Sequence, residues 1–118
     1  MAPWIHQPWA AGLFRVAAES KDLEMESGKR ELIESVFAGD GEMATRMRAL
    51  DWSATPLGPV EQWPQALRTS VRIVLDSGCA MSICWGPDFT YLYNDGYLPF
   101  IGTKHPSALG RPCREVYP

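Results

Sequence analysis

The segment MSICWGPDFTYLY, residues 81–93, decides the fold class of this chain. In each half of the segment, large apolar residues alternate with smaller residues at a period of two, as in strands. Gly86, Pro87 and Asp88 separate the two halves, and these residue types favour a short loop. We therefore predict an antiparallel hairpin with strands over residues 81–85 and 89–93.

The residues before the hairpin repeat instead with the period of a helix. This pattern predicts helices over residues 20–37, 42–50 and 64–77, separated by glycine-rich and proline-rich turns. Asp40 lies near the start of the second helix, where a carboxylate can cap backbone N–H groups. The predicted class is α+β, with helices preceding and covering a short hairpin.

The residues after the hairpin are consistent with this class. Asn94 and Asp95 follow the second strand directly and are placed to cap a short helix around residues 96–101. Gly102 is suited to end that helix. Residues 104–118 include three prolines and predict turns with one short helical piece.

Composition limits the kind of protein and its partners. The chain has 118 residues, 46% of them apolar and 21% charged, which is ordinary for one small globular domain. Its net charge is −3, and Lys and Arg are scattered, so nucleic acid is not expected as a partner.

Location and redox state follow from similar arguments. The N-terminus lacks the basic and continuous apolar regions of a signal peptide, and no window approaches the roughly 18 apolar residues of a membrane span. Cys79, Cys84 and Cys113 form no CxxC pair, so neither a disulfide framework nor a zinc site is indicated. We expect a cytoplasmic chain with reduced thiols, no membrane insertion and no bound metal.

We divide the chain into three parts. Residues 1–19 contain prolines and lack a regular period, which predicts an irregular tail. Residues 20–50 form a helical N-terminal extension. Residues 51–118 hold the hairpin and most of the functional information.

Five motifs in the last part carry a family resemblance. They are DWSATPLGP (51–59), WPQALRT (63–69), WGP (85–87), YNDGY (93–97) and GTKHPSALG (102–110). In this order they resemble the opening of a group of PAS sensory domains near the N-terminus of bacterial two-component sensor histidine kinases. The resemblance covers residues 51–118.

The resemblance implies a five-stranded antiparallel sheet with short helices over one face and a pocket for a small ligand. On that pattern, residues 81–85 and 89–93 are the first two strands, and residues 94–102 begin the pocket wall. The other three strands would follow residue 118, so we expect an incomplete PAS-like fold, truncated after its first half. The pocket residues on this reading are Ile83, Tyr93, Tyr97 and Phe100.

Other residues of these motifs have structural interpretations. Trp52, Trp63 and Trp85 stand beside proline turns and are expected to pack those turns against a helix. Asn94 and Asp95 are interpreted as helix caps. His105 lies in a proline-flanked loop without partner ligands, so a loop hydrogen bond is favoured over a metal or haem.

The function that follows is sensory. A histidine kinase needs an acceptor histidine on a helix and an ATP-binding domain, and neither is found here, so we expect no catalysis by this chain. We expect a signal-input module that binds an unknown small ligand, a kinase partner domain or a second copy, without haem or flavin. Two alternatives stay open: an interaction or dimerisation module that uses the exposed edge of the hairpin at residues 89–93, or a truncated gene product without independent function.

Overall fold

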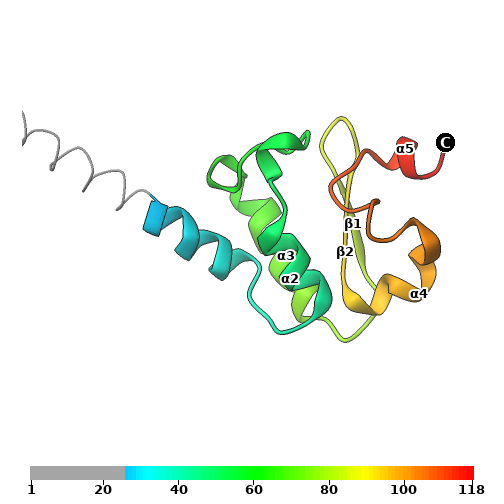
Figure 1. Cartoon of the computed structure of the whole chain (residues 1–118), viewed down its shortest axis with the longest axis horizontal. Coiled ribbons are helices and arrows are strands. Elements are labelled where there is room, and N and C mark those ends of the chain that lie inside the picture. The colour runs from blue at the N-terminus through cyan, green and yellow to red at the C-terminus, as the bar shows by residue number, and fades with distance from the viewer. Residues whose placement is uncertain (1–25) are drawn as a thin grey trace, which may run out of the picture. The chain divides into compact units, whose positions relative to one another are not determined.

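The computed structural model contains the predicted antiparallel hairpin at its centre (Figure 1). Strand β1 (Ser82–Trp85) pairs with strand β2 (Thr90–Tyr93), and Ser82 lies opposite Tyr93. The structure describes residues 26–118, and residues 32–118 form one compact unit. The mixed class of helices with a short antiparallel sheet is confirmed, while a PAS-like fold stays a prediction.

Both strands are one residue shorter than predicted: β1 begins at Ser82 instead of Met81, and β2 loses Phe89 to the turn. The Phe89 N–H donates to the Gly86 carbonyl over 3.0 Å, which closes the turn around Pro87 and Asp88. Phe89 has a φ of 50° and is 60% exposed, so it belongs to the turn and not to the second strand.

The helices lie close to their predicted positions. A helix occupies residues 26–36, followed by α2 (Glu42–Ala49) and α3 (Gln65–Asp76). Short 3-10 turns occupy Trp52–Ala54, Val60–Gln62, Asp95–Tyr97 and Gly102–Lys104, and the short helices are α4 (Leu98–Ile101) and α5 (Cys113–Val116). Pro64 precedes α3 as its N-cap residue and does not occupy its first turn.

The hairpin has helices on both of its sides (Figure 1). The helices α2 and α3 lie on one side, and the segment from α4 to α5 lies on the other. Because side chains alternate along a strand, Leu92 faces one side of the hairpin and Tyr91 and Tyr93 face the other.

One hydrophobic core joins the helices to the hairpin. Its buried members are Val36, Phe37, Met43, Met47, Trp52, Val60, Trp63, Leu67, Val71, Tyr91, Leu92, Tyr93, Ile101, Ala108, Leu109 and Val116. Residues 32–50 therefore share a core with residues 51–118, which the sequence had left open. The predicted tail over 1–19 and the start of the first helix lie outside the described residues. No helix among the described residues has the length and apolar character to cross a membrane.

Thr90 leads to a prediction about stability. Its side chain is 0% exposed, and its Oγ1 has no hydrogen-bond partner among the residues described. A buried hydroxyl without a partner costs free energy, and valine has nearly the same shape without that group. We expect Thr90→Val to raise the free energy of unfolding by about 1 kcal/mol, measured by urea denaturation. An equal rise in Thr45→Val, whose exposed hydroxyl donates to the Gly41 carbonyl, would contradict this explanation.

Candidate functional site

Four tyrosines gather on one side of the hairpin. Tyr91 and Tyr93 come from β2, Tyr97 ends the 3-10 turn after it, and Tyr117 follows α5. The Tyr91 ring centroid lies 5.6 Å from that of Tyr93, 6.1 Å from that of Tyr97 and 6.2 Å from that of Tyr117. We call these four residues and His105 the tyrosine face.

The phenol groups of the tyrosine face differ in exposure. Tyr91 is buried, and its hydroxyl donates to the hydroxyl of the half-buried Tyr97 over 2.8 Å. Burial, and then this hydrogen bond, raise the pKa of Tyr91 well above its ordinary value, so the phenol stays neutral. Tyr117 is 46% exposed, and its ring lies under the Lys104 ammonium at 5.2 Å. The tyrosine face thus has the buried Tyr91 at its base and the exposed Tyr117 at its rim.

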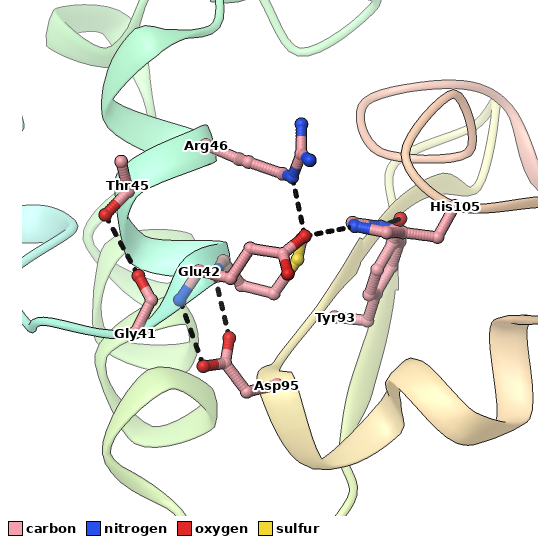
Figure 2. Close-up of polar contacts among 8 residues, drawn as sticks. Gly41, Glu42, Thr45, Arg46, Tyr93, Asp95 and His105 are labelled. Carbon is pink, nitrogen blue, oxygen red and sulfur yellow. Dashed lines mark hydrogen bonds and ion pairs between the residues drawn. The ribbon is translucent and has the colours of Figure 1, made fainter.

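His105 connects this face to helix α2 (Figure 2). Its Nδ1 lies 2.7 Å from the Tyr93 hydroxyl, and its Nε2 lies 2.5 Å from the Glu42 carboxylate. A neutral imidazole with its proton on Nε2 satisfies both contacts, because Nε2 then donates to Glu42 and Nδ1 accepts from Tyr93. Arg46 donates to the same Glu42 oxygen over 2.7 Å. His105 therefore makes long-range contacts, beyond the loop hydrogen bond expected from the sequence.

The order carboxylate, imidazole, hydroxyl is that of a hydrolase triad, but the hydroxyl is unsuited to attack. Tyr93 is 0% exposed, so no substrate carbonyl can approach its oxygen. Burial raises the pKa of Tyr93 to about 12, which disfavours the phenolate. The three side chains thus join β2, the loop at His105 and α2, and they offer no accessible nucleophile.

The pH dependence of stability should show the contribution of Glu42. The hydrogen bond from Arg46, and then that from His105, lower the pKa of Glu42 below its ordinary 4.5. A carboxylate with a lowered folded-state pKa stabilises the fold above its unfolded-state pKa and loses this effect as the pH falls through the folded-state value. Urea denaturation should find Glu42→Gln less stable than wild type near neutrality, with the gap closing in acid well below 4.5. Glu34→Gln, at an exposed position, should show a smaller gap at every pH.

Asp95 caps a helix from a distant part of the chain. Its carboxylate accepts from the N–H of Glu42 over 3.1 Å and from the N–H of Met43 over 2.8 Å, at the start of α2 (Figure 2). The predicted caps are therefore wrong in two respects. Asp95 caps α2 instead of the helix that follows it, and Asp40 makes no side-chain cap because Gly41 is the N-cap residue of α2.

Gly41 is required for this cap. A Cβ at position 41 would lie 2.4 Å from Asp95 Oδ2, closer than atoms in contact can approach. The missing side chain lets the carboxylate reach the first turn of α2, where the N–H groups and the helix dipole favour negative charge.

We expect Asp95→Ala to lower the free energy of unfolding by about 1–2 kcal/mol, because α2 loses its only side-chain cap among the described residues. Gly41→Ala should cost at least as much, since it displaces the same carboxylate. The double variant should cost less than the sum of the two, which a double-mutant cycle in urea measures. Asp40→Ala is the matched control and should change stability by less than about 0.5 kcal/mol. Additive costs would exclude a shared contact.

Asn94 joins three segments through one buried amide. Its Nδ2 donates to the carbonyls of Val74 over 2.9 Å and Cys79 over 2.7 Å. Its Oδ1 accepts from the N–H of Met81 over 3.0 Å and of Tyr97 over 3.1 Å. The predicted capping role after β2 is confirmed, because Tyr97 lies in the 3-10 turn that Asn94 begins. The sequence did not indicate the two bonds that Asn94 donates.

The predicted tryptophans occupy different environments. Trp52 and Trp63 are each 3% exposed and meet edge-to-face at 5.1 Å, with the Phe37 ring beside both. Trp52 Nε1 donates to the Met47 carbonyl, and Trp63 Nε1 donates to the Gly58 carbonyl. Their packing of the proline turn against the helices is as expected, while Trp85 is only half-buried at the end of β1.

The structure does not bring the four predicted pocket residues together. Tyr97 lies 6.0 Å from Tyr93 and 5.7 Å from Phe100 between ring centroids, so these three are neighbours. Ile83 pairs with Leu92 in the hairpin and shares the opposite face, because alternation separates it from Tyr93. Phe100 is 69% exposed. A ligand-binding role for these residues stays a prediction.

No local sequence pattern indicates the partners that make this site. Tyr91, Tyr117, Glu42 and Arg46 were not singled out. Tyr91 follows from the period-two pattern of β2, but Glu42 and His105 lie 63 positions apart and no local pattern connects them.

The free edge of the hairpin also differs from expectation. The outer edge of β2 is covered, because Tyr91 N–H donates to the Arg111 carbonyl over 2.9 Å and Gly110 N–H donates to the Tyr91 carbonyl over 2.8 Å. Cys113 N–H also donates to the Phe89 carbonyl. The alternative of an interaction module that uses the exposed edge at residues 89–93 is therefore wrong for β2, because that edge is already paired. Within the described hairpin, only β1 has an unpaired edge.

The described residues hold no group of three or more His, Cys, Asp or Glu side chains suited to a metal ion. The expectation of a chain without metal, haem or flavin stays a prediction. Comparison with family models, curated proteins and solved structures finds no match to this chain.

Proposed function

We propose that this chain is the front half of a PAS-type signal-input module, belonging to or derived from a two-component sensor histidine kinase. It binds a small ligand or a partner domain and has no turnover of its own. The observation that carries the proposal is the tyrosine face. The motif residues Tyr93, Asn94, Asp95, Tyr97 and His105 all take part in the contacts around it.

The polar contacts suggest how binding would be transmitted. A ligand or partner on the tyrosine face would first contact the half-buried Tyr97 and the exposed rim at Tyr117 and Phe100. Movement there would alter the contacts of His105 and Asp95, which hold the first turn of α2. Binding that favours one arrangement of these contacts would shift the population of the module toward that state.

The absence of catalysis fits the same site. Its imidazole lies between a carboxylate and a fully buried phenol, so it has no accessible nucleophile to activate. The cytoplasmic location, the lack of haem or flavin and the kinase partner are parts of this proposal. Purified protein should be colourless from about 350 to 600 nm, where haem and flavin absorb.

The coding sequence downstream of residue 118 provides the sharpest test. We expect it to encode three further strands, then a helix with an acceptor histidine and an ATP-binding domain. Incubation of the isolated chain with labelled ATP should leave it unphosphorylated. A downstream sequence that encodes none of these parts, or label on this chain alone, would overturn the proposal.

A further inference from the structure

A pocket of about 270 Å³, which we call the arginine pocket, lies between the helix over residues 26–36 and α3. Leu32 and Val36 give it apolar surface, and α3 contributes the guanidinium groups of Arg68 and Arg72. The other lining residues are Ser35, Gln65 and Thr69. All of them belong to the compact unit over residues 32–118. Among the residues described, no aspartate or glutamate lines this pocket, although the whole chain has a net charge of −3.

Arg72 is fixed by its neighbours. One of its terminal nitrogens donates to the carbonyls of Ala38 over 2.8 Å and Val36 over 3.3 Å. The other donates to the Asp76 carboxylate, which balances its charge. Arg72 therefore holds the end of the helix over residues 26–36 against α3 and gives the arginine pocket a defined shape.

Arg68 has weaker contacts than Arg72. One of its terminal nitrogens donates to the Glu61 carbonyl over 3.0 Å, which is a neutral acceptor. Its Nε is buried and has no hydrogen-bond partner within residues 26–118. A buried donor without an acceptor costs free energy, and a guanidinium group is best satisfied by a planar oxyanion that accepts two hydrogen bonds. The guanidinium of Arg68 is thus suited to a carboxylate.

We infer that the arginine pocket binds a small aliphatic carboxylate, with the carboxylate at Arg68 and the alkyl chain against Leu32 and Val36. The inference is independent of the proposed sensory function, because no residue of the tyrosine face lines this pocket. Thr69 Oγ1 accepts from the Gln65 amide over 3.2 Å, so the Thr69 hydroxyl proton is left to donate to the ligand.

The chemistry of the lining selects among small ligands. A cationic amine would be repelled by two arginines in a pocket that no described carboxylate lines. Inorganic phosphate matches the charge but gains nothing from Leu32, which is half-buried, or from Val36. The volume is slightly below the roughly 300–1,000 Å³ of pockets for drug-sized ligands, so the ligand should be small.

Titration of the full chain with hexanoate, followed by two-dimensional NMR of the backbone amides, tests the ligand class. We expect saturable shifts centred on residues 32–36 and 65–72. Butyrate has two fewer methylene groups to bury and should bind about tenfold more weakly. Hexylamine, with the same chain and the opposite charge, should not bind. No saturable shifts with hexanoate, equal binding of hexylamine, or phosphate binding as tight as hexanoate would overturn the inference.

Variants in the arginine pocket test the assigned residues. Arg68→Gln should raise the hexanoate dissociation constant about tenfold or more, while Arg114→Gln, at an exposed arginine outside the pocket, should leave it within about twofold.

Thr69→Glu tests the pocket without changing either arginine. Thr69 is exposed on α3, so this variant should fold while its carboxylate repels hexanoate and pairs with Arg68. Thr69→Gln, which adds similar bulk without charge, is the matched control and should weaken binding much less. Circular dichroism checks that each variant is folded. Hexanoate binding by Thr69→Glu or Arg68→Gln that equals the wild type would overturn the inference.

Discussion

Asn94→Ala is expected to lower the free energy of unfolding by about 2–4 kcal/mol, a large effect for a polar substitution among residues 26–118. The side chain is 2% exposed and makes four hydrogen bonds. Its removal leaves the Met81 N–H without its partner, and it takes one of two hydrogen bonds from the Tyr97 N–H and from the Val74 and Cys79 carbonyls. A buried polar group that loses its partner costs about 1–3 kcal/mol, and each further lost bond adds about 1 kcal/mol or less. These groups belong to α3, to the loop after it and to the turn after β2. Asn94 therefore links these three segments through a single side chain, and its loss weakens all of these links at once.

Two further variants, one at Asn94 and one at the exposed Gln65, test whether the hydrogen bonds of Asn94 cause the loss of stability. Asn94→Asp keeps the shape and the accepting oxygens but cannot donate to the carbonyls of Val74 and Cys79 when ionised, so it should also destabilise strongly. Gln65→Ala removes an exposed amide on α3 and should cost less than about 0.5 kcal/mol. Urea denaturation followed by circular dichroism measures all three. A loss below about 1 kcal/mol for Asn94→Ala would show that water satisfies these groups.

Trp52→Ala should lower the free energy of unfolding by about 3–5 kcal/mol, because it removes a large side chain from the centre of the core. Its ring lies 5.7 Å from that of Phe37 and 5.1 Å from that of Trp63, between centroids. The cavity would border Phe37, Trp63 and the end of α2 at Met47, which lie in three separate segments, so no single element can close it by shifting.

A milder variant separates packing from hydrogen bonding at the same position. Trp52→Phe keeps an aromatic ring but removes the donor to the Met47 carbonyl, and we expect a cost of about 1–3 kcal/mol. Ile73→Ala, at a side chain 57% exposed, is the control and should cost much less. Thermal unfolding can rank the three variants. Equal effects of Trp52→Ala and Ile73→Ala would contradict the assignment of Trp52 to the core.

Local patterns predicted most of the elements because their information lies within a few residues. The change of period from 3.6 to 2 near Gly78 placed α3 to within one residue at each end and β1 to within one residue at its start. The glycine-rich segment over 39–41 separated the helices before them. The end of the second strand was predicted correctly, while its start was wrong by one residue. Phe89 continues the apolar pattern, but the hydrogen bond to Gly86 draws it into the turn.

The candidate site was predicted only in part. Tyr93, Asn94, Tyr97 and His105 were singled out because their motifs resemble those of a family, and all four make contacts at or beside the tyrosine face. Ile83 was assigned to the same pocket but lies on the other face of the hairpin, since register decides which side each strand residue meets.

The sequence by itself determined the α+β class, the hairpin, the main helices and the capping role of Asn94. Helix and strand propensity, hydrophobic period and capping all depend on residues that are close together in the sequence. Only the tertiary structure decided that Asp95 caps α2, that His105 bonds to Glu42, and that the open edge belongs to β1. Each of these depends on which distant segments pack together, and burial of one shared core decides that packing. Residues 81–93 thus specify a hairpin locally, while the segments that cover each side of it depend on the fold of the whole unit.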